Sequence, residues 1–295
     1  METPSEGTGA WEADESAEPH EESSEDAVGR ESFARRLAVA EGRSQSEGPG
    51  TSGPESTLDE RVKAFRQQAL DRESTLREEM RQVVVAAGGI PGHEQERPKE
   101  DRDTRTGQEK LEDWHRVHLV GLEHAVKDID SLRPKFSRYE AAGMSGSDVT
   151  ARIKDAVRYT IQLPDDQYSA GAWKAIDALT AQGHEPLEVR NSWDDKVYRG
   201  VNTSWRDHAS GLNFEVQFHT PFSFLVKQST HSIYKVQREL DPAKEHEREK
   251  IGELQQRQAV FTHFATAPPG AETIVSPKER EQREAQSQDR QEGWS

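Results

Sequence analysis

Residues 213–220 hold the side chains in this chain that are best suited to chemistry. Apolar and polar residues alternate there with a period of two, which is typical of a β-strand with two different faces. One face is aromatic and aliphatic, and the other carries Glu215, Gln217 and His219. A row of carboxylate, amide and imidazole groups is costly to bury unless it meets solvent, a metal or a substrate. The pattern therefore predicts a functional strand face.

Two upstream segments add charged and aromatic residues near expected strands. Asp155 and Arg158 lie at the start of a strand predicted over residues 156–163. A third segment holds Tyr198, Arg199 and Asn202. Asp155 and Glu215 are sixty positions apart, so only adjacent strands could bring the two carboxylates together. His219 and His231 are twelve positions apart with no third ligand in an established motif, which disfavours a zinc site there.

The elements before this region are predicted to be helical. A capping-box pattern at residues 57–60 opens an apolar stripe that predicts a helix ending at Gly88. We interpret the stripe as packing, with a docking helix for a partner as the alternative. A second capping-box pattern at residues 106–109 predicts a helix that continues through Ile129 and stops before Pro134.

The rest of the chain alternates between the two periodicities. The pattern predicts helices over residues 148–154, capped by Ser147, and over 170–182, 221–240 and 243–262. Strands are predicted over residues 156–163, 186–193, 197–206 and 212–220, the last two joined as an antiparallel hairpin. This order predicts a mixed β-sheet flanked by helices, in an α+β or α/β architecture.

Composition divides the 295 residues into four segments. Residues 1–55 form an acidic segment predicted to be disordered, and residues 56–105 form an amphipathic helix and a charged linker. Residues 106–262 form the folded domain, and residues 263–295 form a polar tail, with disorder expected from Glu279 onward. The net charge of −16 resides mostly in the flanks, because residues 151–240 hold eleven acidic and eleven basic residues.

Several classes of protein are disfavoured by what the sequence lacks. It holds no cysteine, so disulfides, thiolate catalysis and cysteine-ligated zinc are excluded. No apolar run reaches the length of a membrane span, and the start of the sequence lacks the pattern of a secretory signal. We therefore expect a cytoplasmic protein that does not interact with a membrane.

Five separated segments between residues 122 and 238 carry motifs in the same order as the motifs of one protein family. Together they resemble the synthetase domain of RelA/SpoT-like proteins, the alarmone pyrophosphokinases. The resemblance implies a nucleotidyltransferase-like fold, Mg²⁺ as cofactor, and ATP and a purine nucleotide as substrates. It covers somewhat under half of the chain. No His-Asp dipeptide occurs in the sequence, so the hydrolase domain of bifunctional relatives is not expected.

The resemblance also implies a role for each site residue. Asp155 and Glu215 would hold the metal, and Glu215 would act as the catalytic base. Lys127, Ser131 and Lys135 keep the family's spacing of four and four, which predicts one helix face that binds ATP. The other expected phosphate-binding residues are Arg158 and Lys227. The expected acceptor-binding residues are Tyr198, Arg199, Asn202, Gln217, His219 and His231.

The sequence departs from the family pattern at four positions. Ala125, Val197, Asn202 and His219 stand where the family usually has arginine, glycine, histidine and arginine. Three functions are therefore considered. The first is synthesis of an alarmone by a growth-inhibiting toxin or a stress-triggered enzyme, which leaves a neutralising or regulatory protein partner open. The second is pyrophosphorylation of the tRNA 3′ end, which the neutral core disfavours. The third is a catalytically inactive nucleotide-binding regulatory module.

Overall fold

The computed structural model describes residues 56–91, 94–95 and 106–292. The predictions for the acidic segment 1–55 and for most of the charged linker fall outside these residues. In the described part of the chain, no helix combines the length and the apolar character that crossing a lipid bilayer requires.

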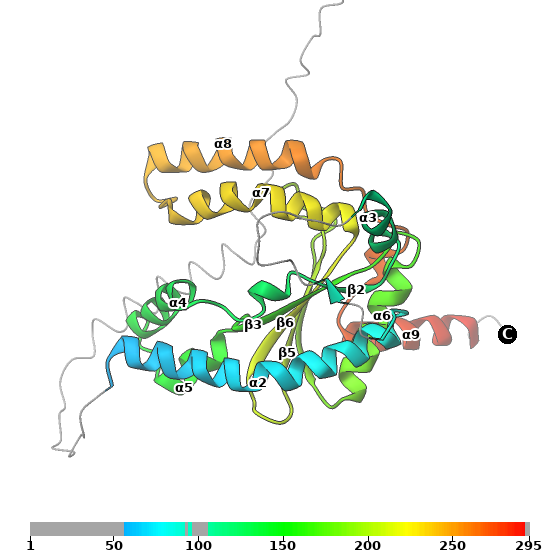
Figure 1. Ribbon diagram of the computed structural model, residues 1–295, viewed down its shortest axis with the longest axis horizontal. Helices are drawn as coiled ribbons and strands as arrows, with labels where there is room; N and C mark the ends of the chain where they lie inside the picture. The colour runs from blue at the N-terminus through cyan, green and yellow to red at the C-terminus, as the bar shows by residue number, and fades with distance from the viewer. Residues whose placement is uncertain (1–55, 92–93, 96–105, 293–295) are drawn as a thin grey trace, which may run out of the picture. The chain divides into compact units, whose positions relative to one another are not determined.

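Six strands form one mixed sheet within the described residues, in the order β1-β2-β3-β6-β5-β4 (Figure 1). The strands are β1 (Glu94–Gln95), β2 (His118–Val120), β3 (Val157–Gln162), β4 (Glu185–Asn191), β5 (Val201–Arg206) and β6 (Asn213–His219). The pairs β1–β2 and β3–β6 are parallel, and the other neighbours are antiparallel. The α+β class and the antiparallel hairpin predicted from the sequence are thereby confirmed.

Helices flank this sheet on both faces. They are α2 (Leu58–Ala86), α3 (Gly107–Trp114), α4 (Ile129–Ala141), α5 (Gly146–Arg152), α6 (Tyr168–Ala181), α7 (Pro221–Glu239), α8 (Glu245–Thr262) and α9 (Pro277–Glu292). Two short 3₁₀ turns are η1 (Leu122–His124) and η2 (Ala271–Thr273). Figure 1 shows α2 on one side of the sheet and α7 with α8 on the other.

The central strands β3 and β6 divide their side chains between these two sides. The Tyr159 hydroxyl donates to the Glu73 carbonyl at 3.0 Å, so Tyr159 faces α2. Its neighbour Arg158 faces α7, together with Glu215 and Gln217 of β6. Every residue of β6 is buried. The polar face of β6 is therefore covered by other side chains, and its groups must find partners there.

The first predicted helix is confirmed as α2. Thr57 caps it, and the reciprocal contact between Thr57 and Glu60 completes the capping box. Most of its apolar stripe is buried in the core, including Val62, Leu76 and Met80, whereas Leu70 is exposed. The structure thus supports the packing interpretation of the stripe.

The second predicted helix is wrong beyond Trp114. Residues 118–120 form β2 instead, with Leu119 opposite Ile161 of β3. Pairing with the sheet overrides the helical spacing of the apolar residues, because it buries His118, Leu119 and Val120 together. A new helix, α4, begins at Ile129 and contains Pro134, at which the sequence predicted an end.

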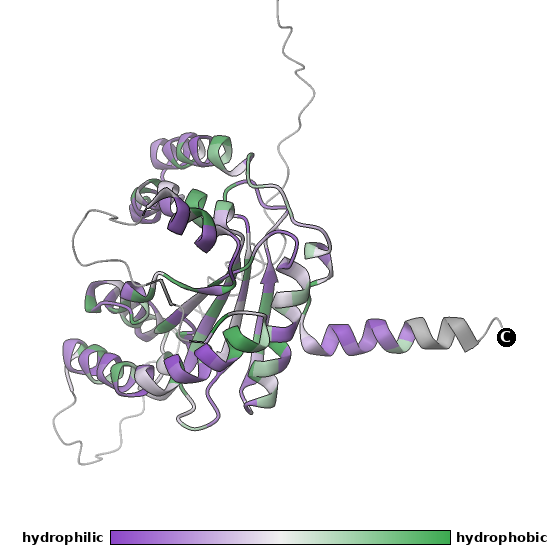
Figure 2. Ribbon diagram, turned by 45° about the vertical axis from the view of Figure 1, so that its right-hand side comes forward, coloured by the Kyte–Doolittle hydropathy of each residue, from purple (hydrophilic) through white to green (hydrophobic). Residues whose placement is uncertain are grey.

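Three smaller predictions also need correction. Ser145, not Ser147, caps the helix before β3. The strand predicted over residues 197–206 begins only at Val201. The tail expected to be disordered from Glu279 onward forms α9, whose hydrophilic character Figure 2 shows. Arg280 attaches α9 to α6, because its guanidinium contacts Asp177 at 3.0 Å and lies 4.5 Å from the centre of the Trp173 ring.

Candidate active site

The parallel pairing of β3 with β6 brings the two predicted carboxylates to one place. Arg158 and Glu215 are direct partners in the register of these strands. The Arg158 Nε donates to Glu215 Oε2 at 2.6 Å, and one terminal nitrogen lies 3.3 Å from Asp155 Oδ2. The guanidinium of Arg158 thus joins both carboxylates, although they are sixty positions apart in the sequence.

Two lysines complete the surroundings of Asp155. The Lys127 ammonium donates to Asp155 Oδ2, and the Lys135 ammonium contacts Oδ1 at 2.6 Å. Burial alone would raise the pKa of Asp155, but the two ammonium groups more than offset it and hold that pKa well below its ordinary value. Asp155 is therefore ionised, and three cations converge on it.

Burial and mutual repulsion also act on Lys127. Desolvation is the largest effect and lowers the pKa of Lys127 to about 8, with the charges of Arg158 and Lys135 in the same direction and that of Asp155 opposed. Asp155 therefore offsets only part of the cost of burying the Lys127 ammonium among other cations. A polyphosphate placed beside it would supply the missing negative charge.

The spacing of Lys127, Ser131 and Lys135 does not place them on one helix face, as the sequence predicted. Asp128 caps α4 and accepts the backbone N–H of Ser131 at 2.6 Å, so Lys127 precedes the helix. A short backbone pairing positions Lys127 instead. Its N–H donates to the Ala156 carbonyl at 3.0 Å, and the Arg158 N–H donates to the Ala125 carbonyl at 2.7 Å.

Gln217 and Lys227 extend the network along the polar face of β6. The Gln217 amide donates to Glu215 Oε1 at 2.9 Å, and the Lys227 ammonium donates to the Gln217 amide oxygen. Burial lowers the pKa of Lys227 to about 7, helped by repulsion from Arg158 and opposed by Glu215. The structure thus connects Lys227, on α7, to the carboxylate site through one amide.

A separate polar cluster surrounds His219 at the end of β6. The Tyr198 hydroxyl lies 2.6 Å from Asn202 Oδ1 and 2.8 Å from His219 Nε2. His219 Nδ1 lies 2.9 Å from the Ser223 hydroxyl. Burial and the charge of Lys227 hold the pKa of His219 well below its ordinary value, so its imidazole is neutral. These contacts fix the orientation of the Tyr198 ring.

Sequence reasoning missed two members of this cluster. Ser223 is the third residue of α7, in the capping turn with Thr220. Gly200 has a φ of +152°, and a Cβ added there would lie 2.8 Å from Cε1 of His219. Only glycine allows the chain to pass this close to the imidazole.

Outside the His219 cluster, the side chains of three further predicted residues make no hydrogen bond to the carboxylate network within the described part of the chain. The Ser131 hydroxyl is one turn into α4, and the Arg199 Nε is buried without a hydrogen-bond partner. His231 is exposed one turn beyond Lys227 on α7. Partial burial and the nearby charge of Lys235 lower the pKa of His231. These positions remain predictions for contacts with a substrate.

The donor set at Asp155 and Glu215 fits Mg²⁺. This ion takes oxygen ligands and is usually bound by one or two carboxylates together with waters and substrate phosphates. Among the described residues, Oε1 of Glu215 accepts only from the neutral Gln217 amide, whereas Oε2 accepts from Arg158. One carboxylate oxygen therefore faces no protein cation and can face a metal ion.

Comparison with known proteins finds similarity only among solved structures. No family model matches the chain, and no curated protein matches it. The protein smu.1046c from Streptococcus mutans UA159 is 17% identical over 54% of this chain and 78% of its own, with a TM-score of 0.36.

Two further structures carry descriptive names. The type VI effector Tas1, solved in complex with its immunity protein, is 15% identical over 70% of this chain and 97% of its own, with a TM-score of 0.40. The small alarmone synthetase 1 from Bacillus subtilis is 14% identical over 62% of this chain and 86% of its own, with a TM-score of 0.35.

Proposed function

We propose that this chain is an ATP-dependent pyrophosphokinase that transfers the β,γ-diphosphate of ATP to the 3′-hydroxyl of a purine nucleotide. The observation that carries the proposal is the convergence of Lys127, Lys135 and Arg158 on Asp155, just before β3. Arg158 also contacts Glu215 on the neighbouring parallel strand β6. Phosphoryl transfer relies on positioning and on balancing charge, and these residue types supply both.

The reaction balances with one base and one leaving group. The 3′-oxygen of the acceptor forms a bond to the β-phosphorus of ATP, and the bond from that phosphorus to the α,β-bridging oxygen breaks. AMP leaves with the electron pair, and Glu215 takes the proton of the attacking hydroxyl. Mg²⁺, held by Asp155 and Glu215, would neutralise charge on the transferred phosphates.

In this proposal, the phosphates of ATP replace Asp155 as the partners of two site lysines. Without substrate, Lys127 and Lys135 are neutralised by Asp155. With ATP bound, their ammonium groups would exchange Asp155 for phosphate oxygens, and this exchange would release the carboxylate for the metal ion. Tyr198, whose hydroxyl is fixed by Asn202 and His219, would stack on the acceptor base.

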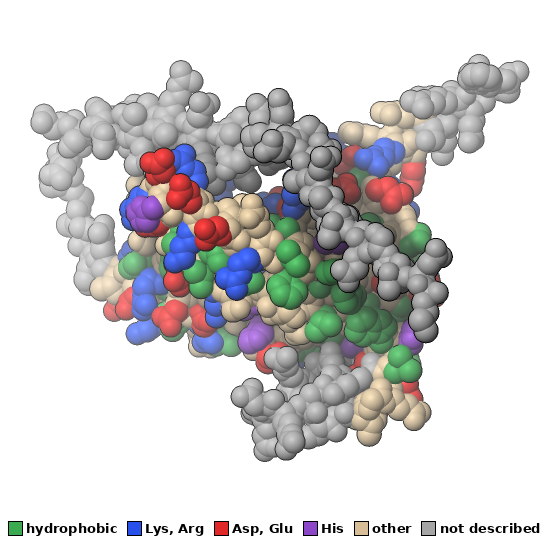
Figure 3. Space-filling model, turned by 90° about the horizontal axis from the view of Figure 1, so that it is seen from above, with side chains coloured by type: hydrophobic (Ala, Val, Ile, Leu, Met, Phe, Trp, Pro, Cys, Tyr) green, Lys and Arg blue, Asp and Glu red, His purple; other side chains and the backbone are tan. Residues whose placement is uncertain are grey.

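A small nucleotide is the acceptor that the surface charges support best. Seen from the α8 side, basic and acidic side chains are interspersed over the surface that Figure 3 shows in colour, without a continuous basic stripe. A long RNA acceptor is usually bound by such a stripe. The tRNA 3′ end is therefore the second candidate. A protein that removes the product or neutralises the enzyme would complete this proposal, because no hydrolase motif accompanies the site.

Labelled ATP tests the proposal directly. The full chain is incubated with Mg²⁺, with GTP, GDP, ATP, AMP or deacylated tRNA as acceptor, and with ATP labelled with ³²P at either the γ- or the α-position. We expect the γ-label to appear on one acceptor and the α-label to appear only in AMP. Transfer of the α-label to the acceptor would instead identify a nucleotidyltransferase. No transfer of either label would leave the nucleotide-binding module as the better interpretation.

The lowered pKa of Lys227 predicts a pH dependence of nucleotide binding. In the free protein Lys227 loses its proton as the pH rises through about 7, and a nearby polyphosphate favours the charged form. Binding of ATP should therefore take up protons, and its affinity should fall up to about 10-fold per pH unit between pH 7 and 9. Calorimetry in buffers of different ionisation enthalpy measures this uptake. A Lys227→Met variant should bind more weakly and lose the part of the dependence that begins near pH 7, while the part due to Lys127, whose pKa is about 8, remains. An unchanged pH profile would show that Lys227 does not contact the phosphates.

A further inference from the structure

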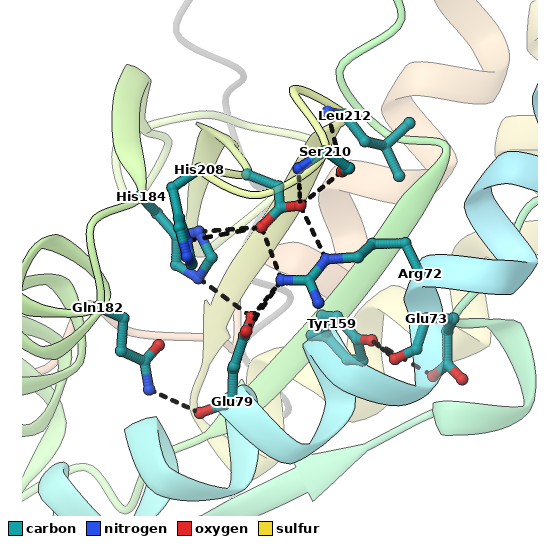
Figure 4. A network of polar contacts seen from close by, with 10 residues as sticks. Arg72, Glu73, Glu79, Tyr159, Gln182, His184, His208, Ser210 and Leu212 are labelled. Carbon is teal, nitrogen blue, oxygen red and sulfur yellow. Dashed lines mark hydrogen bonds and ion pairs between the residues drawn. The ribbon is translucent and has the colours of Figure 1, made fainter.

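A second cluster of metal-ligating side chains lies on the face of the sheet opposite to Glu215 (Figure 4). His184 follows α6, and Asp207 and His208 begin the turn between β5 and β6. The ring of His184 packs edge-on against Phe214, whose side chain points away from that of its neighbour Glu215. One nitrogen from each histidine and one oxygen of Asp207 lie within 4.8 Å of one another.

In the described part of the chain, His184 is buried and its ring nitrogens lack hydrogen bonds. Its side chain is 0% exposed, and neither ring nitrogen has a hydrogen-bond partner among the described residues. Nδ1 lies 3.5 Å from Asp207 Oδ1, and Nε2 lies 3.4 Å from Glu79 Oε2. Buried polar groups are nearly always satisfied, because leaving them without partners costs the free energy of desolvation. Both nitrogens point at carboxylates at distances slightly too long for good hydrogen bonds.

We propose that His184, Asp207 and His208 bind a divalent transition-metal ion, and that zinc is the ion this donor set suits best. Imidazole nitrogens with one carboxylate oxygen are typical ligands of zinc. Ligand bonds of about 2.1 Å in a tetrahedral site place neighbouring ligand atoms about 3.4 Å apart. The pair of His184 and Asp207 already has this separation at 3.5 Å.

The remaining ligand can reach the site with a small movement. His208 Nδ1 lies 3.9 Å from Asp207 Oδ1, and its side chain is 47% exposed. The ligand atoms lie within 4.8 Å of one another, and an exposed imidazole can change its rotamer to close such a gap without disturbing the core. The exposure of His208 also leaves the fourth coordination position open to water, whereas the other two ligands are fully buried.

The surroundings of the cluster support its ligands. Nε2 of His184 lies 3.4 Å from Glu79 Oε2, so a proton on Nε2 would face this carboxylate and leave Nδ1 for the metal. A carboxylate in this position is typical of zinc-bound histidine. Arg72 and the Ser210 N–H hold Asp207 at 2.8 and 2.9 Å. Two carboxylates and one guanidinium give a local charge of −1, which favours an additional cation.

A sharp backbone turn at Gly183 places His184 beside the other two ligands. Gly183 has a φ of +87°, a conformation that turns the chain sharply between α6 and β4 and that side chains other than glycine rarely adopt. A Cβ at Gly183 would lie 3.7 Å from the His208 ring, so the turn passes directly beside the second histidine. A bound metal ion would cross-link the α6–β4 connection to the β5–β6 turn. It would therefore stabilise the folded state.

A metal titration of the full chain, without an affinity tag, tests this proposal. The protein is stripped with a chelator and titrated with Zn²⁺ alone by calorimetry, and with Co²⁺ alone by visible absorption. We expect one saturable equivalent of Zn²⁺, a higher midpoint of thermal unfolding, and cobalt absorption bands of a tetrahedral site. His208→Ala should weaken Zn²⁺ binding at least 10-fold.

His246→Ala is the matched control, because His246 is 79% exposed on α8 and distant in sequence from the cluster. This variant should bind Zn²⁺ like the wild type. Equal affinity of the wild type and both variants, or no saturable binding, would overturn the proposal. The metal-free midpoint of thermal unfolding shows whether His208→Ala folds, and His208→Gln, which keeps more of the side chain, repeats the test if it does not.

Discussion

Replacing Glu215 with glutamine should lower kcat for diphosphate transfer by about 10²- to 10⁴-fold, which is the usual contribution of general base catalysis. The substitution keeps the size of the side chain and removes only its charge and basicity. The new amide oxygen can still accept from Arg158, and only the contact from Gln217 is lost, so the fold should persist. The loss should appear in the labelled-ATP assay at saturating ATP and acceptor.

Glu188→Gln is the matched control for this prediction. Glu188 is an exposed carboxylate on β4 that pairs with Lys154 at 2.6 Å, outside the carboxylate network. This variant should keep the wild-type rate, because exposed ion pairs contribute little to stability and Glu188 contacts none of the site residues. A Glu215→Gln enzyme that keeps more than a tenth of the wild-type rate would show that Glu215 is not the base.

Replacing Arg72 with methionine should lower the free energy of unfolding by about 3–5 kcal/mol, which is typical when one partner of a buried ion pair is removed. Arg72 holds Asp207 through two bonds of 2.8 Å, and the Asp207 side chain is 0% exposed. Methionine fills similar space but leaves a buried carboxylate without its cation. Urea unfolding of metal-free protein at pH 7 measures the loss.

The same ion pair predicts how this loss depends on pH. Burial alone would raise the pKa of Asp207, but bonds from Arg72 and Ser210 hold it well below its ordinary value. A carboxyl with a depressed pKa stabilises the fold above its unfolded pKa of about 3.9, and this stabilisation is lost as the pH falls toward the folded pKa. In Arg72→Met, burial without the guanidinium raises the pKa of Asp207 above its ordinary value. The difference between wild type and Arg72→Met should therefore be largest above that raised pKa and shrink as the pH falls through it toward about pH 4.

Two controls accompany the Arg72 measurement. Arg81→Met removes an exposed pair with Glu78 on the same helix and should cost about 1 kcal/mol or less. Arg72→Met combined with Asp207→Asn removes both charges, so the double variant should be more stable than Arg72→Met alone. A double variant that is less stable than Arg72→Met would contradict the argument, because the loss would then not come from an unpaired carboxylate.

Much of the fold could be predicted because its signals are local. The alternation in β6, the capping boxes at Thr57 and Thr106, and the helical spacing of α2 all depend on residues within a few positions of one another. The meeting of Asp155 with Glu215 was also predicted, since two short polar strands could be placed side by side in a sheet. The roles of these residues in catalysis stay predictions.

The parts that could not be predicted depend on contacts between distant residues. Residues 118–129 have a helical spacing of apolar side chains, but pairing with β3 decides their structure. Backbone hydrogen bonds between residues 125–127 and residues 156–158 place Lys127 beside Asp155. No local sequence pattern predicts these hydrogen bonds. The three residues of the His184 cluster come from the end of α6 and from the β5–β6 turn, and their supporting residues come from α2. No single stretch of sequence therefore indicates the cluster.

The parallel pairing of β3 with β6 sets the moment during synthesis at which the site can first exist. Arg158 and Glu215 are 57 positions apart, and α6, β4 and β5 lie between them in the chain. A parallel pair cannot form through a short hairpin, and contacts over such separations form late and slowly. A growing chain that ends before β6 therefore carries the Lys127, Lys135 and Asp155 cluster without its second carboxylate. Any activity of the site must wait until β6 has been made and paired with β3.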